Sequence, residues 1–350
     1  MSSLYCNFPK RSKKCFDRHC KILASSSFIP SKIVSNDEII QKFNFPFKSS
    51  AIFKSLGVET RHVAEEHMAD SDVLKESSQK CLDKIGLSPE KLSRLIVNKY
   101  YGDNLLPMTA SNLLKKLGSR VAVHSFDIDG GVSAFLYSVD VISRFINTGD
   151  DYILLASGGV NARLMNKHDP KVAFLFGDAS ASLLFGYSEE KHILASYFYT
   201  NPQYYDLALA KADPFAMDAD SNLILDEQNS ITFDSYHLGD LKIAEDLYIK
   251  ATREISDNLL DESGLDMDDI DLVLVTENSR QIWELTLEAL GGVSEDKSIS
   301  VLKNYGNTMT AMLPLLIDVG FETGRIQPEM HIMLISHGEG INGGGLIYKV

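Results

Sequence analysis

GLSPEKLSRLIVNK, residues 86–99, returns in altered form as GLDMDDIDLVLVTE, residues 264–277, and this pair of stretches decides the fold. Each copy reads as the glycine end of a helix, an acidic turn and then a short apolar run typical of a buried strand. The two copies start about half a chain length apart in a protein of 350 residues. The sequence therefore predicts an internal duplication.

Two further pairs support the duplication because they occur in the same order and at a similar spacing. YILLASGG (152–159) matches HIMLISHG (331–338), and HSFDIDGG (124–131) falls opposite LKNYGN (302–307). Short apolar runs alternate with amphipathic stretches in each half, which favours βαβ units with mostly parallel central strands. Helices are expected at 73–85, 133–147, 241–261 and 308–323.

This pattern divides the chain into four parts. We expect two pseudo-equivalent α/β halves joined by a polar, turn-rich region, after a basic extension with Lys10, Arg11, Lys13, Lys14 and Arg18. We expect that extension to be solvated and partly disordered; the alternative is a tail that clamps an acidic group. The parts are 1–20 (extension), 21–188 (N-terminal half), 189–240 (connecting region) and 241–350 (C-terminal half).

Composition excludes several classes of protein. A net charge of −14 argues against nucleic-acid binding and against docking on an anionic membrane. No apolar run reaches the length of about 20 residues that a membrane-spanning helix requires, and the N-terminus has no apolar core of a signal peptide. Four cysteines do not form a disulfide framework, so a reducing cytoplasm is expected.

The motifs and their order resemble the thiolase-type condensing enzymes, most closely β-ketoacyl-ACP synthase III. FLFGDASASLLF (174–185) resembles that family's Phe-Gly-Asp stretch, and NYGNTMTAMLPL (304–315) resembles its Gly-Asn-Thr motif. LGVETRHVA (56–64) is also similar to a family segment, and the resemblance runs from about residue 21 to residue 350. It implies a thiolase-like, duplicated αβαβα sandwich.

The family's catalytic residues are a Cys at a helix N-terminus, a His and an Asn, and two of the three positions differ here. Alignment on FDIDGGVSAF (126–135) places the family Cys at Val132, which has no nucleophilic atom. Glu277 takes the His position, and only Asn307 is retained. Glu339 stands in the glycine-rich loop that lends an oxyanion-hole N–H, so it places negative charge where an oxyanion forms.

The surfaces that deliver substrate in the family also differ. Ile282 takes the position of an Arg that grips the acidic carrier protein, and Glu284 and Glu288 make that helix acidic. The CoA-stacking aromatic and a nearby Arg fall at about Ala51 and Ser55. We expect Trp283 and Ile282 either to form an altered contact surface or to be partly buried.

These differences predict a family member that does not itself condense. Because the family forms dimers, we expect a homodimer or a heterodimer with an active ketosynthase paralogue in fatty-acid or specialised-metabolite synthesis. An acyl thioester in the tunnel is the expected ligand, with no cofactor and no metal.

The alternative is a re-purposed hydrolase, decarboxylase or acyltransferase acting on acyl thioesters. It would use Glu277 with the neighbouring Asp129, Glu339 and His337, with Ser133 as a replacement nucleophile. A metal held by those carboxylates and His337 is a third, weaker possibility, because no i,i+4 ligand pair supports it.

Overall fold

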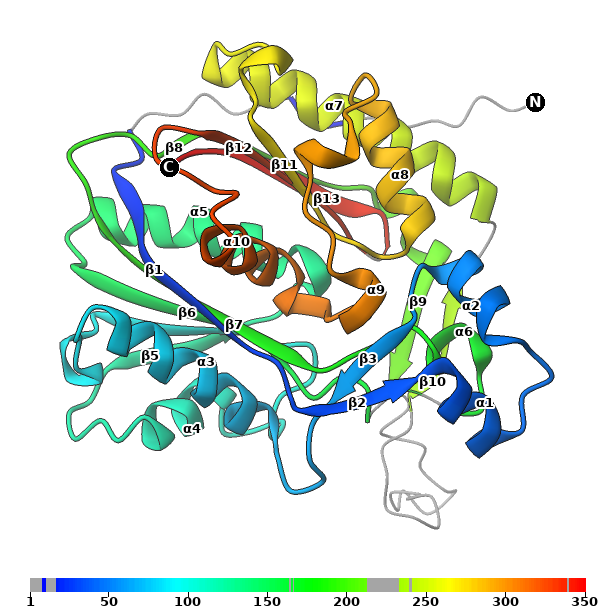
Figure 1. Ribbon diagram of the computed structural model, residues 1–350. Helices are drawn as coiled ribbons and strands as arrows, with labels where there is room; N and C mark the ends of the chain where they lie inside the picture. Colours follow the sequence, from blue (N-terminus) through cyan, green and yellow to red (C-terminus); the bar gives the residue numbers. More distant parts are fainter. Residues whose placement is uncertain are drawn as a thin grey trace.

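A computed structural model describes residues 8–10, 17–163, 165, 167–212, 233–238, 241–338 and 340–350 (Figure 1). Most of these residues belong to two β-sheets with helices between and outside them. No helix among the described residues is both long and apolar enough to cross a membrane.

The first sheet has five strands, and it is built from the N-terminal half. Its order is β1 (Cys20–Phe28), β7 (Ala179–Tyr187), β6 (Tyr152–Gly159), β4 (Arg94–Asn98), β5 (His124–Ile128). β4 pairs in parallel with β5 and β6, whereas β7 pairs antiparallel with β1 and β6. β5 is therefore an edge strand.

The second sheet repeats this arrangement with four strands. Its order is β11 (Leu272–Val275), β12 (His331–Gly338), β13 (Asn342–Lys349), β8 (Ile193–Thr200). β11 and β12 are parallel, and the other two pairings are antiparallel. A single parallel bridge between Val273 and Ser298 stands where a counterpart of β5 would lie. The predicted duplication is confirmed, since β4, β6 and β7 correspond to β11, β12 and β13.

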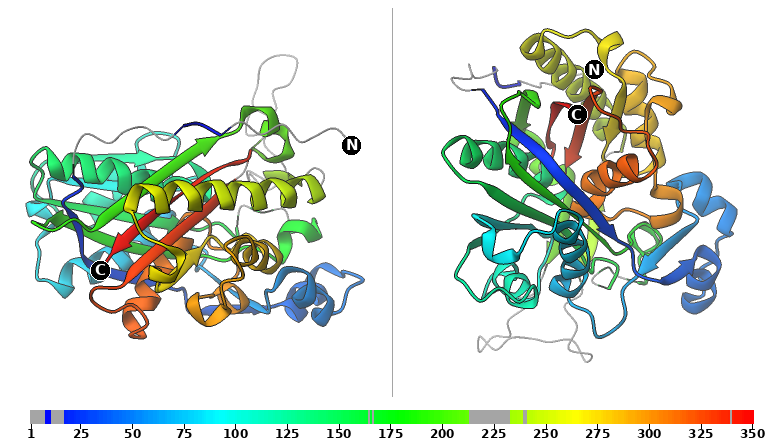
Figure 2. Two further views of the ribbon diagram at one scale, coloured as in Figure 1. Left: turned by 90° about the horizontal axis from the view of Figure 1, so that it is seen from above. Right: turned by 60° about the vertical axis from the view of Figure 1, so that its left-hand side comes forward.

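Five layers result from the packing of the helices on these sheets (Figures 1 and 2). Side chains of α5 (Ala134–Asn147) and α10 (Met312–Glu322) form one core with the inner faces of both sheets. α3 (Asp70–Lys84) and α4 (Thr109–Lys116) pack on the outer face of the first sheet. α7 (Leu241–Ser263) and α8 (Arg280–Ala289) pack on the outer face of the second. The thiolase-like αβαβα sandwich is therefore present.

Sequence explains why α5 and α10 occupy the middle layer. α10 reads MLPLLIDVGFE, and nearly all of its residues are buried, as expected for a helix that is apolar around most of its circumference. α3 instead places an apolar stripe against the sheet and leaves polar residues outside. The four expected helices are all present, and their observed ends differ from the expected ones by at most four residues.

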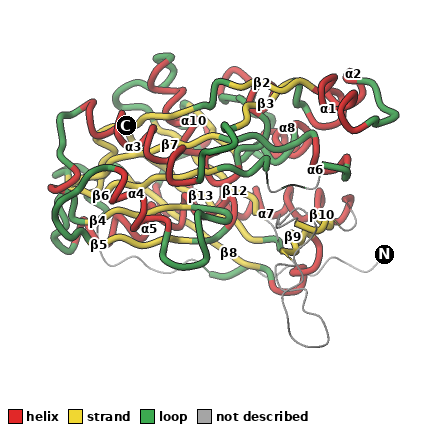
Figure 3. The backbone as a smooth tube through the Cα atoms, turned by 90° about the horizontal axis from the view of Figure 1, so that it is seen from below, coloured by secondary structure: helices red, strands yellow, loops and turns green. Residues whose placement is uncertain are grey.

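A smaller lobe lies at the end of the molecule away from β5 (Figure 3). It contains a two-stranded sheet and short helices: β2 (Lys32–Ser35), β3 (Thr60–Val63), α1 (Asn36–Phe43), α2 (Ser49–Leu56) and α6 (Pro170–Ala173). Ser35 and Glu38 form a capping box that begins α1. The remaining elements are α9 (Leu302–Tyr305) and the hairpin of β9 (Ala208–Ala212) and β10 (Phe233–Leu238).

Three expectations about organisation need correction. The strands are not mostly parallel, because β7 pairs antiparallel with both of its neighbours in the first sheet and β13 does so in the second. An apolar run that is covered on both faces does not reveal the direction of its strand. The connecting region 189–240 contains β8, which pairs with β13 and so is part of the second sheet. The basic extension is not simply solvated: Arg18 is only 4% exposed, and β1 begins at Cys20.

Candidate active site

Val132 lies in the turn that joins β5 to α5, as the sequence predicts. Gly131 has a φ of +57°, a left-handed conformation that suits glycine, and residues 131–133 form a short 3₁₀ turn before α5 begins at Ala134. In a strand–turn–helix unit of this kind, backbone N–H groups of the first turn surround the residue at the helix N-terminus. The turn therefore has the shape for an activated side chain, but the side chain is an isopropyl group.

Apolar side chains enclose Val132, which is 1% exposed. The enclosing set, here called the Val132 cluster, is Val132, Met165, Val172, Phe176, Met309 and Met312, with Tyr100 and Leu175 packed against it. A medium of this kind opposes the formation of an anion, whether thiolate, alkoxide or tetrahedral oxyanion. The geometry therefore provides an apolar plug at the residue that the sequence alignment predicts to stand in the family's nucleophile position.

Glu277 follows β11 and turns towards the start of α9. Its Oε2 accepts hydrogen bonds from the backbone N–H groups of Val301 (2.9 Å) and Leu302 (3.2 Å). Its Oε1 is buried and has no hydrogen-bond partner within the part of the chain that the structure describes. Burial raises the pKa of this carboxyl from 4.5 to about 7, although the side chain of Ser300 and the two backbone donors oppose the shift. Glu277 thus caps the first turn of a short helix.

Asn307 holds a loop instead of facing an open cavity. Its Oδ1 accepts a hydrogen bond from the N–H of Met309 (2.8 Å), whose φ is +54°. Asn307 also exchanges backbone hydrogen bonds with the FLFG stretch, through the O of Leu175 (2.8 Å) and the N–H of Gly177 (3.0 Å). A Cβ at Gly177 would lie 2.1 Å from the backbone O of Tyr305, so only glycine fits there.

Two methionines bring these three positions together. Met309 and Met312 both pack with Val132 in the cluster. The backbone N–H of Glu277 lies 2.6 Å from the sulfur of Met312, and Asn307 binds the N–H of Met309. Val132, Glu277 and Asn307 therefore surround one place in the fold. This plug was not predicted from the sequence, although the two methionines stand three positions apart at the start of a predicted helix and so share a face.

The described residues of the alternative site have different surroundings. His337 is fully buried, its Nε2 lies 2.9 Å from the hydroxyl of Thr252 on α7, and burial lowers its pKa to about 4. Asp129 is exposed. Ser133 is buried, and its hydroxyl lies 2.8 Å from that of Ser336, behind the turn.

The alternative site also included Glu339 of the glycine-rich loop and a possible metal ion. Glu339 lies outside the described residues. Within the described residues, no group of three or more His, Cys, Asp or Glu side chains has the arrangement of a metal site. His337 and the described carboxylates therefore give no geometric support to the metal hypothesis.

α8, the helix predicted to stand where the family contacts its carrier protein, exposes acidic side chains and buries its apolar ones. Glu284 and Glu288 are exposed, and Glu284 forms an ion pair with Arg280 (2.5 Å). Trp283 is only 2% exposed, and Ile282 packs against the core of the second sheet, which corrects the idea of an exposed apolar contact surface. An α-helix turns about 100° per residue, so Trp283 points inward while Glu284 points outward.

The positions expected to contact CoA lie on α2. Ala51 and Ser55 are both exposed there. A methyl group and a hydroxyl supply neither the ring nor the guanidinium that would hold an adenine or a phosphate. The register of this stretch stays a prediction.

Comparisons with known proteins agree with this architecture. Residues 126–202 match the family model described as 3-oxoacyl-[acyl-carrier-protein (ACP)] synthase III, and residues 260–350 match the model of its C-terminal part. A β-ketoacyl-[acyl-carrier-protein] synthase III of Neisseria meningitidis is 26% identical over 329 residues, which span 93% of this chain and 97% of the relative. These matches support the assignment of the chain to the β-ketoacyl-ACP synthase III family of thiolase-like condensing enzymes.

Solved structures show the same fold. The 3-oxoacyl-[acyl-carrier-protein] synthase III of Aquifex aeolicus is 21% identical, with a TM-score of 0.80 over 95% of this chain and 100% of that one. The priming β-ketosynthase of the R1128 polyketide biosynthetic pathway is 18% identical, with a TM-score of 0.84 over 96% and 98% of the two chains. The assignment of Val132, Glu277 and Asn307 to the family's catalytic positions stays a prediction.

Three motifs on which the resemblance rested are bound to one another. Asp178, in the FLFGDASASLLF stretch, accepts hydrogen bonds from the N–H groups of Ala64 (2.8 Å) and Ala162 (2.7 Å). Its own N–H donates to the O of His62 (2.8 Å), and the same stretch binds Asn307. These three motifs therefore support the fold around Val132, Glu277 and Asn307.

Proposed function

We propose that this chain is a non-condensing subunit that pairs with an active ketosynthase of the same family in fatty-acid or polyketide-type synthesis. The observation that carries the proposal is the Val132 cluster. An acyl transfer through this position needs a nucleophilic atom and a polar hole for the oxyanion, and the cluster offers neither.

Surfaces suited to subunit pairing support the proposal. Leu105 and Leu106 are 86% and 80% exposed, in the loop between β4 and α4. β5 is an edge strand whose residues are exposed or half-buried. Paired apolar side chains exposed to this degree are costly unless a partner covers them. A family dimer joined through these elements would bury them, so a role in assembly accounts for features that catalysis does not.

Charge on α8 supports the same proposal. The exposed Glu284 and Glu288 would repel an acidic carrier protein, so delivery of substrate would fall to the partner subunit. The free buried Cys20 and Cys81 suit a reducing cytoplasm, where we propose that the pair works.

Thiol release tests the proposal. The purified chain is incubated with a panel of acyl-CoA and malonyl-CoA thioesters, and free thiol is followed in the wild type and in Glu277→Ala. We expect no release above background from either protein. Co-expression with an active ketosynthase of the same family from the same organism should yield a mixed dimer, and two separate homodimers would contradict the proposal.

A second candidate function is a re-purposed acyl-thioester hydrolase or decarboxylase that uses Glu277. One observation favours it: the unpaired Oε1 and the pKa of about 7 are properties of a general base near neutral pH. Thiol release that Glu277→Ala abolishes would support this candidate and overturn the first. Release that the substitution leaves unchanged would contradict both.

A further inference from the structure

β8 is the last strand of the second sheet, and the N-terminal extension meets its open side. Among the described strands, β8 pairs with β13 alone. The backbone O of Leu194 and the backbone N–H of Ser196, on either side of Ala195, bond to side chains instead of to a strand. A pair of backbone groups of this kind is the site where a further strand would add.

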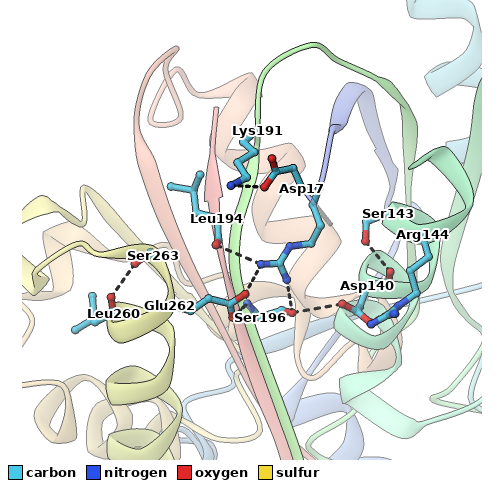
Figure 4. A network of polar contacts seen from close by, with 11 residues as sticks. Asp17, Asp140, Ser143, Arg144, Lys191, Leu194, Ser196, Leu260, Glu262 and Ser263 are labelled. Atoms are coloured by element: carbon cyan, nitrogen blue, oxygen red, sulfur yellow. Dashed lines mark hydrogen bonds and ion pairs between the residues drawn. The ribbon is translucent and has the colours of Figure 1, made fainter. Parts of the chain in front are cut away.

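Two charged side chains occupy that pair (Figure 4). An Nη atom of Arg18 donates to the O of Leu194 (3.2 Å) and to Oε1 of Glu262 (2.6 Å), at the end of α7. The second carboxylate oxygen, Oε2 of Glu262, accepts from the N–H of Ser196 (3.1 Å). The ion pair therefore closes a ring with the two backbone groups on either side of Ala195.

The ring has the hydrogen-bond pattern of a strand pairing. In a parallel ladder, one residue of the neighbouring strand donates to the O before a given residue and accepts from the N–H after it. Arg18 takes the place of that donor, and Glu262 takes the place of that acceptor. The two outward backbone groups that flank Ala195 are thereby bonded to side chains, which offer no backbone to which a second chain could add.

Other contacts fix Arg18 in this position. Its second Nη atom donates to the hydroxyl of Ser196 (2.7 Å), which in turn donates to Asp140 of α5 (3.3 Å). The neighbouring His19 accepts at its backbone O from the N–H of Ser188 (3.2 Å). The side chains of Arg18 and Glu262 are only 5% and 10% exposed, so water does not compete for these bonds.

Earlier residues of the extension also lie on β8. The ring of Phe8 packs edge-on against Tyr199, with centroids 5.1 Å apart, and the hydroxyl of Tyr197 donates to the O of Pro9 (2.8 Å). The extension therefore contacts β8 near both ends of the strand, and in the described part of the chain Arg18 and Glu262 bond to the backbone groups that flank Ala195.

We propose that Arg18 and Glu262 form an edge latch, which keeps a strand of a second copy from adding to β8. The latch directs assembly away from the β8 edge of the second sheet, whereas β5 stays an edge of the first sheet to which a strand can add. This role does not depend on whether the chain condenses, hydrolyses or only assists a partner.

A double replacement by apolar residues tests the latch. Arg18→Met with Glu262→Leu removes both charges together, so neither is left buried and unpaired. In sedimentation over a hundredfold range of concentration, we expect assemblies larger than those of the wild type, with self-association at least tenfold tighter. Sedimentation identical to that of the wild type would overturn the proposal.

Reversing the two charges distinguishes the latch from an ion pair that only attaches the extension to α7. Arg18→Glu with Glu262→Arg keeps the ion pair but aims an acceptor at the O of Leu194 and a donor at the N–H of Ser196. We expect this variant to associate like the apolar one, and wild-type behaviour would mean that the pair only ties the extension to α7. Lys191→Ala is the matched control, because it breaks the exposed Asp17–Lys191 pair (2.5 Å) of the same segment and should sediment like the wild type.

A measurement on the wild type alone guards against a variant that fails to fold. Hydrogen exchange of the Ser196 amide should be at least tenfold slower than that of an amide on an open strand edge. Exchange as fast as at an open edge would contradict the latch.

Discussion

A thiol placed at residue 132 would lie among the methionine and aromatic side chains that now enclose Val132. Buried thiols in this protein behave accordingly, since burial raises the pKa of Cys20 to about 12. We therefore expect Val132→Cys to restore no acyl transfer, because the new thiol stays protonated and Glu277 cannot replace a histidine donor. The measurement is the release of free thiol from acyl-CoA by the variant, in the buffer in which an active family member is assayed.

Labelling with a thiol reagent gives this prediction a control. Ala51→Cys, on the exposed surface of α2, should react at the rate of a free thiol, whereas Val132→Cys should react at least a hundredfold more slowly. Rapid labelling of residue 132, or a burst of CoA release, would show that the Val132 cluster opens and would argue for a latent active site.

Glu277 should make the protein less stable as the pH rises. Its pKa is 4.5 in the unfolded chain and about 7 in the folded one, so its stabilising contribution is complete below pH 4.5 and is lost as the pH rises through 7. The full loss amounts to about 3 kcal/mol, from 1.36 kcal/mol per pKa unit. Glu277→Gln keeps an acceptor for Val301 and Leu302 but carries no charge.

Urea unfolding at pH 5 and pH 8 measures this effect. The wild type should lose about 2–3 kcal/mol more than Glu277→Gln between these two values. His337 acts in the opposite direction, because its lowered pKa contributes stability that is lost as the pH falls from 6.5 to about 4, and comparing the two proteins cancels it. Glu288→Gln, exposed on α8, should behave like the wild type, and equal pH dependence in all three proteins would contradict the prediction.

The sequence predicts where a residue lies in an element, but it does not predict which distant residues that side chain contacts. Val132 was placed correctly in the strand-to-helix turn, because turn glycines and the following apolar stripe mark it. The sequence left open whether Trp283 is a contact residue or is buried, and its burial decides between the two alternatives. The unpaired Oε1 of Glu277 depends on contacts with Val301 and Leu302 that no local pattern encodes.

Among the strands, β6 shows how one glycine fixes a pairing. Gly158 has a φ of +125°, and a Cβ there would lie 2.2 Å from the backbone O of Ala179 on β7. Gly158→Ala should therefore separate β6 from β7 and cost several kcal/mol, well beyond the cost of about 1–2 kcal/mol for a left-handed backbone alone. Gly149→Ala is the matched control, since Gly149 has a φ of +114° and nothing within 4 Å of its Cβ position. Chemical denaturation should show a loss at least twice as large for Gly158, and equal losses would contradict this account.

Element existence was predictable from the sequence, but strand direction was not. The three apolar runs of each half became β4, β6 and β7 and their counterparts. β13 runs antiparallel to β12 because only a three-residue turn separates the two strands. Such a turn can return the chain only in the opposite direction, whereas a parallel neighbour needs a long crossover. Attention to that short connection would have identified the hairpin.

For the whole molecule, the duplication could be predicted because the two halves repeat the same sequence pattern. The boundary of the extension was not, because the burial of Arg18 depends on Glu262, which lies more than 240 positions away. The open edge of β8 and the charges that satisfy it come together only in the folded chain. Composition alone, with its excess of positive charge in residues 1–20, favoured a solvated tail.

Assembly of the whole molecule should depend on the apolar tip of the loop between β4 and α4. Burying Leu105 and Leu106 against a partner would contribute roughly 1.5–3 kcal/mol for each side chain. Replacing both by Ser should therefore weaken association at least tenfold, whether the partner is a second copy or an active ketosynthase. Sedimentation equilibrium gives the dissociation constant. Ile33→Ser is the control, because Ile33 is also exposed (55%) but lies on β2 in the lobe away from β5; equal weakening by this change would mean that the tip has no special part in assembly.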